Sequence, residues 1–199
     1  MTDTPSDFFD LNTAGEQRGD LIPANTIATL QMAIVPGNAG PGGWLKKSQD
    51  GNSEGLDLEF VVVDGKYAKK KFSERWTVEG TTSGHASAKE ISRNKLRAIV
   101  ESARGIRSDD HCETANAGRR LTGGYADLDQ IRFVARIGIR SAEGQYQAKN
   151  RIDEIITPER QDWRKPEQDI AKTMMDGAAP APAASSPPAG AITRPQWAS

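Results

Sequence analysis

Residues 56–78 read LDLEFVVVDGKYAKKKFSERWTV, and this stretch decides the fold. Apolar side chains occupy every second position of its first half, at Leu56, Leu58, Phe60 and Val62. Asp64-Gly65 follows and is a strong signal for a tight turn. The second half returns to the same period, with Phe72, Trp76 and Val78 on one parity. Because a period of two is that of a strand with one buried face, the stretch predicts a β-hairpin.

The segments around this hairpin predict three further strands and one helix. TIATLQMAIVPG, which starts at residue 26, alternates and predicts the first strand. Residues 83–106 change to helical spacing, with Ile91, Leu96, Ile99, Val100 and Ala103 on one face. Ser83 or Ser87 can cap the start of this helix and Gly105 its end. Residues 129–140 and 145–156 alternate again, and SAEG between them predicts a second hairpin.

The order of elements is therefore strand, strand, strand, helix, strand, strand. A five-stranded barrel with one helix between its third and fourth strands is the OB fold, whose second and third strands and L12 and L45 loops bind oligonucleotides or oligosaccharides. The glycine-rich residues 37–55 take the L12 position, and SAEG takes the L45 position. A small β-sandwich and an open α+β sheet are the structural alternatives.

Both ends of the chain differ from this domain, which the pattern places at residues 21–160. Residues 1–20 predict a flexible acidic arm, in which DFFDL is either a docking segment or a local hydrophobic cluster. Residues 161–199 predict a linker and a tail. From about residue 174 the tail is built from Ala, Pro, Ser and Gly, so it has too little apolar surface to become ordered.

Length and composition favour a soluble protein with one domain and two tails. The chain has 199 residues, of which 36% are hydrophobic and 27% charged. No stretch reaches the roughly 18 apolar residues that cross a bilayer, and the first residues lack the order of a signal peptide. Cys112 is the only cysteine, so no internal disulfide can form. We therefore expect a cytoplasmic protein with no membrane partner.

The net charge of −1 conceals a segregation of charge along the chain. Residues 1–20 carry −4 and residues 166–199 carry −1. Residues 21–165 hold 23 Lys and Arg against 19 Asp and Glu, which gives +4. A mildly basic domain between acidic ends suggests a polyanionic partner.

The candidate binding residues are outward-facing cations on the strands and aromatic or basic residues in the loops. Alternate residues of a small barrel fill its interior, and the residues between them face outward. Cations follow phosphates, and aromatic faces accept bases at about 1–3 kcal/mol each, whatever the sequence. The predicted set is Lys69, Lys71 and Arg75 on the third strand, Arg132, Arg136 and Arg140 on the fourth, Lys149 and Arg151 on the fifth, and Trp44, Lys46, Lys47 and Tyr146 in or beside the loops.

These residues also have simpler interpretations. A strand with alternating charges is usually a solvated face, and Asp57 and Glu59 on the neighbouring strand could pair with Arg75 or Lys71. Trp44 either stacks on bases or folds back as a hydrophobic latch. Cations that recur on three strands nevertheless favour nucleic-acid binding, because the fold would gather them on one surface.

With these segments in place, the sequence resembles the phage- and prophage-encoded single-stranded DNA-binding proteins that accompany recombination and replication functions. The resemblance covers about residues 20–157. It rests on LIPANTIATLQMAIVPG, on GLDLEFVVVDGKYAKKKFSERWTVEG leading into KEISRNKLRAIVESARGI, and on FVARIGIRSAEGQYQAKNRIDEII. It implies an OB-fold protein that coats and protects single strands and assists annealing or replication.

The tail departs from the pattern of bacterial single-stranded DNA-binding proteins. Their disordered tail ends in an acidic, hydrophobic tip that recruits repair enzymes, whereas TRPQWAS at residues 193–199 contains no acid. Trp197 is either an anchor for a partner or an uncommitted end. Contact with recombination or replication proteins through this tail is therefore in doubt.

Enzyme chemistry finds little support in the sequence. His85, His111 and Cys112 do not supply the four nitrogen and sulfur ligands of a structural zinc site. GNAGPGG lacks the lysine and the strand-to-helix context of a phosphate-binding loop. Asp109 and Asp110 lie in a segment with the composition of a solvated loop. We expect no enzyme, no cofactor and no metal.

The sequence thus predicts sequence-independent binding of single-stranded DNA in phage or prophage recombination or replication. The alternative is an OB-fold protein–protein adaptor, or a phage structural module, that binds no nucleic acid. RNA binding shares the same physics as DNA binding. No coiled-coil seam or apolar patch specifies whether the chain forms a homo-oligomer.

Overall fold

The computed structural model describes residues 21–144 and 146–168. The compact unit to which they belong ends at Gln168. The predicted acidic arm with its DFFDL segment, and the predicted tail with Trp197, lie outside the described residues.

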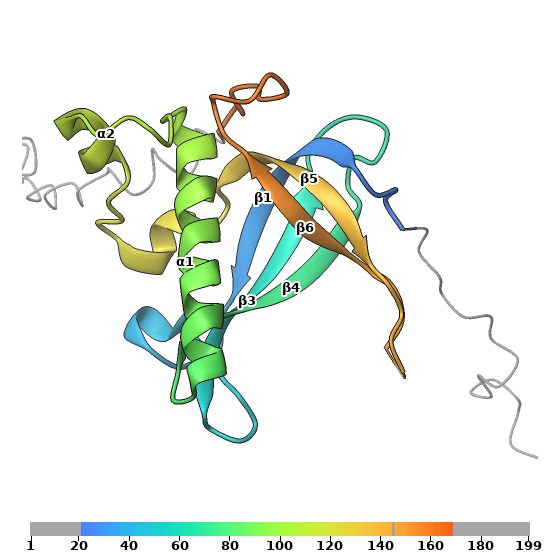
Figure 1. Ribbon diagram of the computed structural model, residues 1–199, viewed down its shortest axis with the longest axis vertical. Coiled ribbons are helices and arrows are strands. Elements are labelled where there is room, and N and C mark those ends of the chain that lie inside the picture. The colour runs from blue at the N-terminus through green and yellow to red at the C-terminus, as the bar shows by residue number, and fades with distance from the viewer. Residues whose placement is uncertain (1–20, 145, 169–199) are drawn as a thin grey trace, which may run out of the picture. The chain divides into compact units, whose positions relative to one another are not determined.

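The described part of the chain is mainly β, with six strands in one antiparallel sheet (Figure 1). The strands are β1 (Thr26–Val35), β2 (Lys46–Lys47), β3 (Ser53–Val62), β4 (Lys71–Gly80), β5 (Arg132–Arg140) and β6 (Lys149–Ile156). Helix α1 (Ser83–Arg104) lies between β4 and β5 in the chain. The short helices are α2 (Glu113–Gly118) and the 3-10 helices η2 (Pro41–Gly43) and η3 (Gly124–Leu128).

The five long strands follow the order β4-β3-β1-β5-β6 across the sheet. The two-residue strand β2 pairs with the beginning of β3, where β1 does not reach. Both the five long strands and the position of the helix between the third and the fourth of them agree with the sequence prediction. The sheet is open, however, because no ladder joins β4 to β6 within the described residues.

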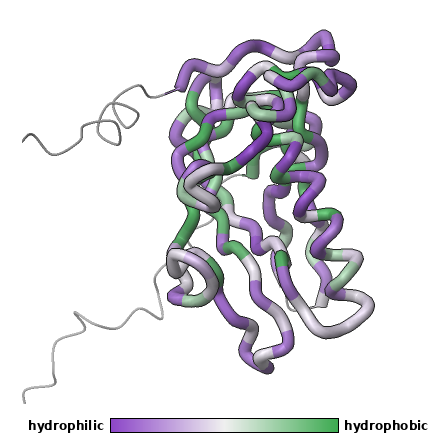
Figure 2. Tube along the Cα trace, turned by 90° about the vertical axis from the view of Figure 1, so that its left-hand side faces the viewer, coloured by the Kyte–Doolittle hydropathy of each residue, from purple (hydrophilic) through white to green (hydrophobic). Residues whose placement is uncertain are grey.

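The strands form as predicted because one face of each is apolar and buried. Phe60 of β3 is fully buried at the centre of the core. Its ring centroid lies 5.3 Å from that of Phe72, 5.9 Å from that of Trp76 and 6.1 Å from that of Phe133. Aromatic contacts at these distances connect β3 with β4 and β5. The alternation of hydrophilic and hydrophobic residues along the chain is visible in Figure 2.

The N-cap of helix α1 lies one residue before Ser83, the nearer of the two caps proposed from the sequence. Thr82 is the N-cap, and its hydroxyl accepts a hydrogen bond of 3.2 Å from the N–H of His85. Gly105 ends the helix with a left-handed φ of 71°, as predicted. The helix buries Leu96 and Ile99 against the sheet. Ile91, predicted on this apolar face, is 57% exposed.

The segment after β6 is fastened to α1 and β5. The indole N–H of Trp163 donates a hydrogen bond of 3.1 Å to the backbone oxygen of Ser102. The side-chain amide of Gln168 accepts from the N–H of Arg132 at 3.0 Å and donates to its C=O at 2.8 Å. Gln168 therefore occupies the place of a neighbouring strand at the start of β5.

Among the described helices none has the length and apolar character to span a bilayer.

Candidate nucleic-acid interface

The outward face of β3 and β4 carries the predicted Lys71 and Arg75, and both are paired with carboxylates. The register places Arg75 directly opposite Asp57. Arg75 Nη1 lies 3.7 Å from Asp57 Oδ1, and its Nη2 donates to the backbone oxygen of Lys46 at 2.9 Å. Lys71 Nζ lies 2.9 Å from Glu59 Oε1. The alternative interpretation is therefore correct for this face: Asp57 and Glu59 pair with the cations and reduce its positive charge.

The glycine-rich loop approaches the same face through β2. Lys46 Nζ lies 2.9 Å from Asp57 Oδ2, and Lys47 Nζ lies 3.8 Å from Glu54 Oε1. Both lysines are exposed, but their backbone is held against β3 as a short strand. The part of the loop that contains Lys46 and Lys47 is thus hydrogen-bonded to the edge of the sheet.

Trp44 takes the latch position, one of the two interpretations that the sequence left open. Its ring is half-buried and packs against the hydrophobic core beside the buried Leu45. A Cβ atom on Gly42 would lie 2.9 Å from the indole, and Gly42 has a φ of 72°. Glycine is therefore required at this position both for space and for backbone conformation. Only part of the indole is open to a base.

Lys69 lies in the β3–β4 turn and not on the strand, which is a correction to the sequence prediction. Strand β4 begins at Lys71. The tight turn expected at Asp64-Gly65 is a longer connection, and Lys69 has a left-handed φ of 71° within it. Tyr67 in this turn is half-buried against the core. The ammonium groups of Lys66 and Lys70 lie 5.5 Å and 5.8 Å from the centroid of its ring.

The β5–β6 hairpin presents the predicted Arg140, Lys149 and Arg151 at its open end. Arg140 and Lys149 are directly opposite each other in the ladder, and both are exposed. Within residues 21–144 and 146–168, neither side chain forms an ion pair. Arg151 Nε lies 2.7 Å from Asp153 Oδ1. Among the described residues, this hairpin end therefore holds two cations that face each other and have no ion-pair partner.

Tyr146 lies in the loop of the same hairpin, as predicted. Its side chain is 72% exposed. Its backbone exchanges two hydrogen bonds of 3.0 Å with Glu143, an isolated antiparallel bridge that holds the loop. The ring is thus accessible for stacking while its backbone is fixed.

The other predicted cations of β5 are engaged elsewhere. Arg132 Nε donates to Gln31 at 3.1 Å, and its Nη1 donates to the backbone oxygen of Glu167 at 3.1 Å. Arg136 Nε lies 3.3 Å from Glu154 Oε2, and Glu154 also pairs with Arg160. An open pocket of about 300 Å³ lies beside this cluster, lined by Arg136, Ile156, Glu159, Arg160, Gln161 and Asp162. Neighbouring groups therefore hold Arg132 at the opposite end of β5 from Arg140 and Arg136 in the middle of the strand.

The edges of β4 and β6 meet through one side chain, which sequence reasoning missed. Glu74 accepts a hydrogen bond from the N–H of Ile152 in β6 through Oε1. Its other oxygen accepts from Trp76 Nε1 at 2.9 Å, and Lys95 Nζ of α1 lies 3.9 Å away. The sequence contained one signal for this contact: Glu74 is a charged residue at a position whose alternation with Phe72 and Trp76 places it on the buried face of the strand. We call this junction the β4–β6 contact.

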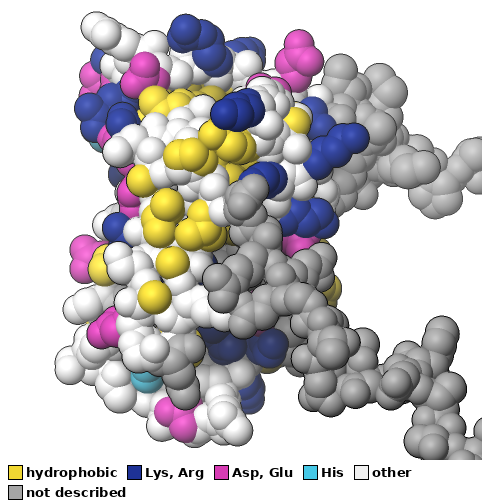
Figure 3. Space-filling model, turned by 90° about the vertical axis from the view of Figure 1, so that its right-hand side faces the viewer, with side chains coloured by type: hydrophobic (Ala, Val, Ile, Leu, Met, Phe, Trp, Pro, Cys, Tyr) yellow, Lys and Arg dark blue, Asp and Glu magenta, His cyan; other side chains and the backbone are white. Residues whose placement is uncertain are grey.

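The β4–β6 contact brings the outward residues of two strands onto adjoining surfaces. Ser73 and Arg75 flank Glu74 in the chain, and Arg151 and Asp153 flank Ile152. Figure 3 views the side of the molecule that lies on the right in Figure 1. Hydrophobic side chains gather there with Lys and Arg side chains around them. The β4–β6 contact thus brings the strand positions of Arg75 and Arg151 near each other, and each of these arginines is paired with an aspartate.

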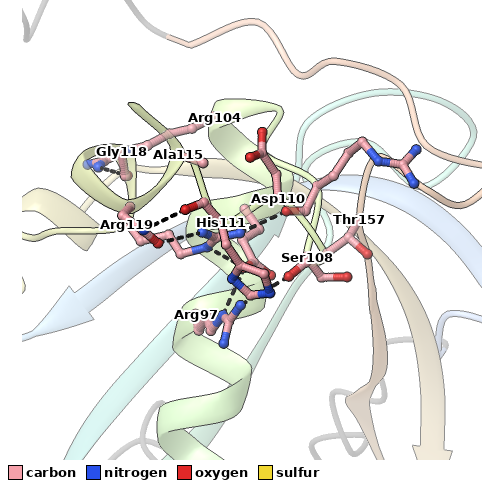
Figure 4. A network of polar contacts seen from close by, with 12 residues as sticks. Arg97, Arg104, Ser108, Asp110, His111, Ala115, Gly118, Arg119 and Thr157 are labelled. Atoms are coloured by element: carbon pink, nitrogen blue, oxygen red, sulfur yellow. Dashed lines mark hydrogen bonds and ion pairs between the residues drawn. The ribbon is translucent and has the colours of Figure 1, made fainter. Parts of the chain in front are cut away.

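A second polar cluster, at the end of α1, was not predicted either (Figure 4). Glu101 is 3% exposed and accepts hydrogen bonds from Arg97 Nε at 2.8 Å and Arg119 Nε at 2.7 Å. Arg119 also donates to the backbone oxygen of Arg107 at 2.8 Å. The i, i+4 spacing of Arg97 and Glu101 was the only sequence signal. This cluster attaches the segment that contains α2 to α1.

The comparisons with known proteins assign no family to this chain. No protein-family model matches it, and no curated protein matches its sequence. In the described part of the chain, no three His, Cys, Asp or Glu side chains are grouped so that they could hold a metal ion. The case for a function therefore rests on the residues and their geometry.

Proposed function

We propose that this protein is an OB-fold protein that binds single-stranded DNA without sequence preference. The OB fold is a partly open five-stranded barrel whose second and third strands and adjoining loops bind oligonucleotides. The strand order β4-β3-β1-β5-β6 and the position of α1 between β4 and β5 support this assignment. The β4–β6 contact supports it too, because a carboxylate joins the two strands at the place where the barrel would close.

One observation carries the proposal: the exposed end of the β5–β6 hairpin combines cations with an aromatic ring. Arg140 and Lys149 are directly opposite each other, and the accessible ring of Tyr146 lies in the loop that joins their strands. Phosphates need such cations, and unstacked bases need such a ring. From this end the surface continues along β6 to the β4–β6 contact and so to Arg75.

The ion pairs of β3 and β4 lower the positive potential of this face, but the cations in them can still bind a phosphate. Exposed pairs contribute about 0–1 kcal/mol each. Lys71 and Lys46 have side-chain exposures of 59% and 55%, so their ammonium groups can exchange a carboxylate for a phosphate at small cost. In this proposal Arg140 and Lys149 contact the strand first, and the paired cations of β4 contribute as it settles.

The setting in which the protein works follows from the resemblance alone. Phage- and prophage-encoded proteins of this kind accompany recombination and replication, so we propose the same role here. Proteins of those processes are then the candidate partners of the C-terminal linker and tail, residues 161–199.

A second function, an OB-fold adaptor for another protein, is favoured by one observation. The cations of β2 and β4 pair with the carboxylates of β3, namely Glu54, Asp57 and Glu59. A surface of matched charges is suited to a protein partner with a complementary pattern.

A salt titration against labelled oligo-dT separates the two functions. The DNA-binding proposal requires tight association at low salt and, for about six phosphate contacts, a slope of log affinity against log salt near −4. No detectable association at low salt would leave the adaptor function. Competition between oligo-dT and oligo-U then distinguishes DNA from RNA binding.

Variants of the hairpin end test the residues of the site. R140Q/K149Q should reduce the magnitude of the slope by about 1.4, since each phosphate contact contributes about 0.7. R93Q/K165Q makes the same change of charge elsewhere on the surface and should leave the slope near its original value. Equal effects of the two variants would show that net charge, and not this site, determines binding.

A further inference from the structure

The β3–β4 turn, residues 63–70, holds the densest group of lysines outside the paired face. It contains Lys66, Lys69 and Lys70 against a single acid, Asp64. Asp64 is engaged with Thr29, whose hydroxyl donates to it at 3.1 Å. On the face that follows, Lys71 and Arg75 have carboxylate partners in β3. Three lysines and one aspartate give the turn a formal charge of +2.

The backbone of this turn is firmly held. The N–H of Lys69 donates to Val62 at 2.8 Å, and the N–H of Val62 donates to Lys70 at 2.9 Å. Further hydrogen bonds link Ala68 to Gly65 at 3.1 Å and Lys70 to Tyr67 at 3.0 Å. The lysine side chains therefore project from fixed positions, which reduces the entropy lost when they contact a ligand.

Lys69 occupies a backbone conformation that a lysine rarely adopts. Its φ of 71° is in the left-handed region, where glycine and asparagine are the favoured residues. Local backbone strain of this kind tends to occur at functional sites. A lysine at this position contributes an exposed positive charge that glycine or asparagine would not.

Tyr67 adds an aromatic ring to this group of cations. The ring is half-buried against the core, so its orientation is fixed by packing. Two ammonium groups, of Lys66 and Lys70, lie within 6 Å of its centroid at 5.5 Å and 5.8 Å. A fixed ring with two cations over it brings together the groups that hold one base and its phosphates, once the ammonium groups move from the ring to the phosphates.

We infer that residues 63–70 are a phosphate anchor of the single-stranded DNA site, with Tyr67 as the ring on which a base stacks. This inference rests on the proposed function. It adds Lys66, Tyr67 and Lys70 to the binding residues and gives Lys69 a role that does not depend on strand β4. A bound strand then contacts two hairpin ends, this turn and the end of the β5–β6 hairpin.

The test measures the affinity for labelled oligo-dT as a function of salt in three proteins. K66Q/K69Q/K70Q should reduce the magnitude of the slope by about 2 and weaken binding on the order of 100-fold at about 50 mM salt. K89Q/R93Q/K165Q, with the same loss of charge at other surface positions, should leave the slope near its wild-type value. Wild-type affinity and slope in the turn variant would overturn the inference while the proposed function stands.

Variants of Tyr67 separate stacking from charge. Y67L should weaken binding by about 5- to 100-fold with an unchanged salt slope, because the lost contact is not ionic. Y67F keeps the ring and should bind nearly as tightly as the wild type. If Y67F loses as much affinity as Y67L, the ring is not a stacking surface.

Lys69 offers a variant in which the new residue suits the local backbone conformation. K69N removes the charge while placing a residue that tolerates the left-handed region. Its melting temperature should be unchanged or higher, and the magnitude of its slope should fall by about 0.7. An unchanged slope in K69N would exclude Lys69 from the anchor. If wild-type protein does not bind oligo-dT at low salt, the proposed function and this inference fail together.

Discussion

The carboxylate of Glu74 in β4 accepts a hydrogen bond from the backbone N–H of Ile152 in β6. Two strands that share no ladder in the described chain are thereby joined through a side chain. The same carboxylate also accepts from Trp76, and its side chain is only 14% exposed. Removal of a nearly buried acceptor with two donors destabilises the folded state, because both donors would then lack a partner.

Replacing Glu74 by alanine should therefore lower the free energy of unfolding by about 2–4 kcal/mol. Glutamine, which keeps one oxygen, should cost about half as much. Urea denaturation followed by tryptophan fluorescence measures both values. Glu79, which is 58% exposed and pairs with Lys89, provides the control, and Glu79→Ala should change stability by less than about 1 kcal/mol. Similar costs at the two glutamates would show that the β4–β6 contact adds no stability.

Glu101 is the acid whose loss should be most damaging. Removal of one partner from a buried ion pair costs about 3–5 kcal/mol, and Glu101 lies between Arg97 and Arg119. We expect Glu101→Ala to lower the free energy of unfolding by about 3 kcal/mol and to release the segment that contains α2. Hydrogen exchange would show the release as faster exchange at the N–H of Ala115. Asp109→Ala, which breaks an exposed pair with Arg107, should leave that exchange slow.

Gly138 and Asp153 should show strong coupling in a double-mutant cycle. A Cβ atom on Gly138 would lie 1.9 Å from Asp153 Oδ2, and Asp153 is paired with Arg151. G138A alone should destabilise the protein by about 1 kcal/mol, since the carboxylate must move. In the D153A background the same change should stabilise it by about 0.5–1 kcal/mol, because alanine suits a strand better than glycine. Thermal denaturation of the four proteins tests this reversal of sign, and additive effects would contradict it.

Asp50 should titrate well below an ordinary carboxyl group. Hydrogen bonds from Ser48 and Asn52 lower the pKa of Asp50 to about 2. Since the folded loop favours the charged form, its stabilisation is complete above the usual pKa of 3.8 and is lost as the pH falls through about 2. Carboxyl carbon chemical shifts measured against pH should give this midpoint. S48A should raise it towards 3.8, and a midpoint near 3.8 in the wild type would contradict the prediction.

The strands and the helix could be predicted from the sequence because their periods are local properties. Phe60, Phe72 and Trp76 lie on the parity that alternation assigned to the interior. Gly105 ends α1 because the backbone adopts a left-handed conformation there, which glycine takes without strain. Neither inference needs knowledge of which strands are neighbours.

The balance of charges on the surface could not be predicted, because it depends on register. A shift of one residue would separate Arg75 from Asp57. Strand β2 has only two residues, too few for a periodic signal, yet it brings Lys46 to the same aspartate. The pairing of these side chains became clear only when the strands were placed side by side.

The turn that holds Lys69 escaped prediction for a different reason. Propensity assigns left-handed positions to glycine, and the sequence offered Gly65 for that purpose. Lysine at such a position contradicts local preference, so no rule based on preference would find it. Contradictions of this kind are expected where a residue is retained for function.

Gln168 sets a lower limit on how far the chain can be shortened. Its amide supplies the partner that the N–H and C=O of Arg132 would otherwise find in another molecule. Exposed strand edges of this kind recruit further copies of the same protein. A truncated protein that ends at residue 160 would keep all six described strands. We expect it to aggregate, because it lacks Gln168, whose side chain covers the edge of β5 at Arg132.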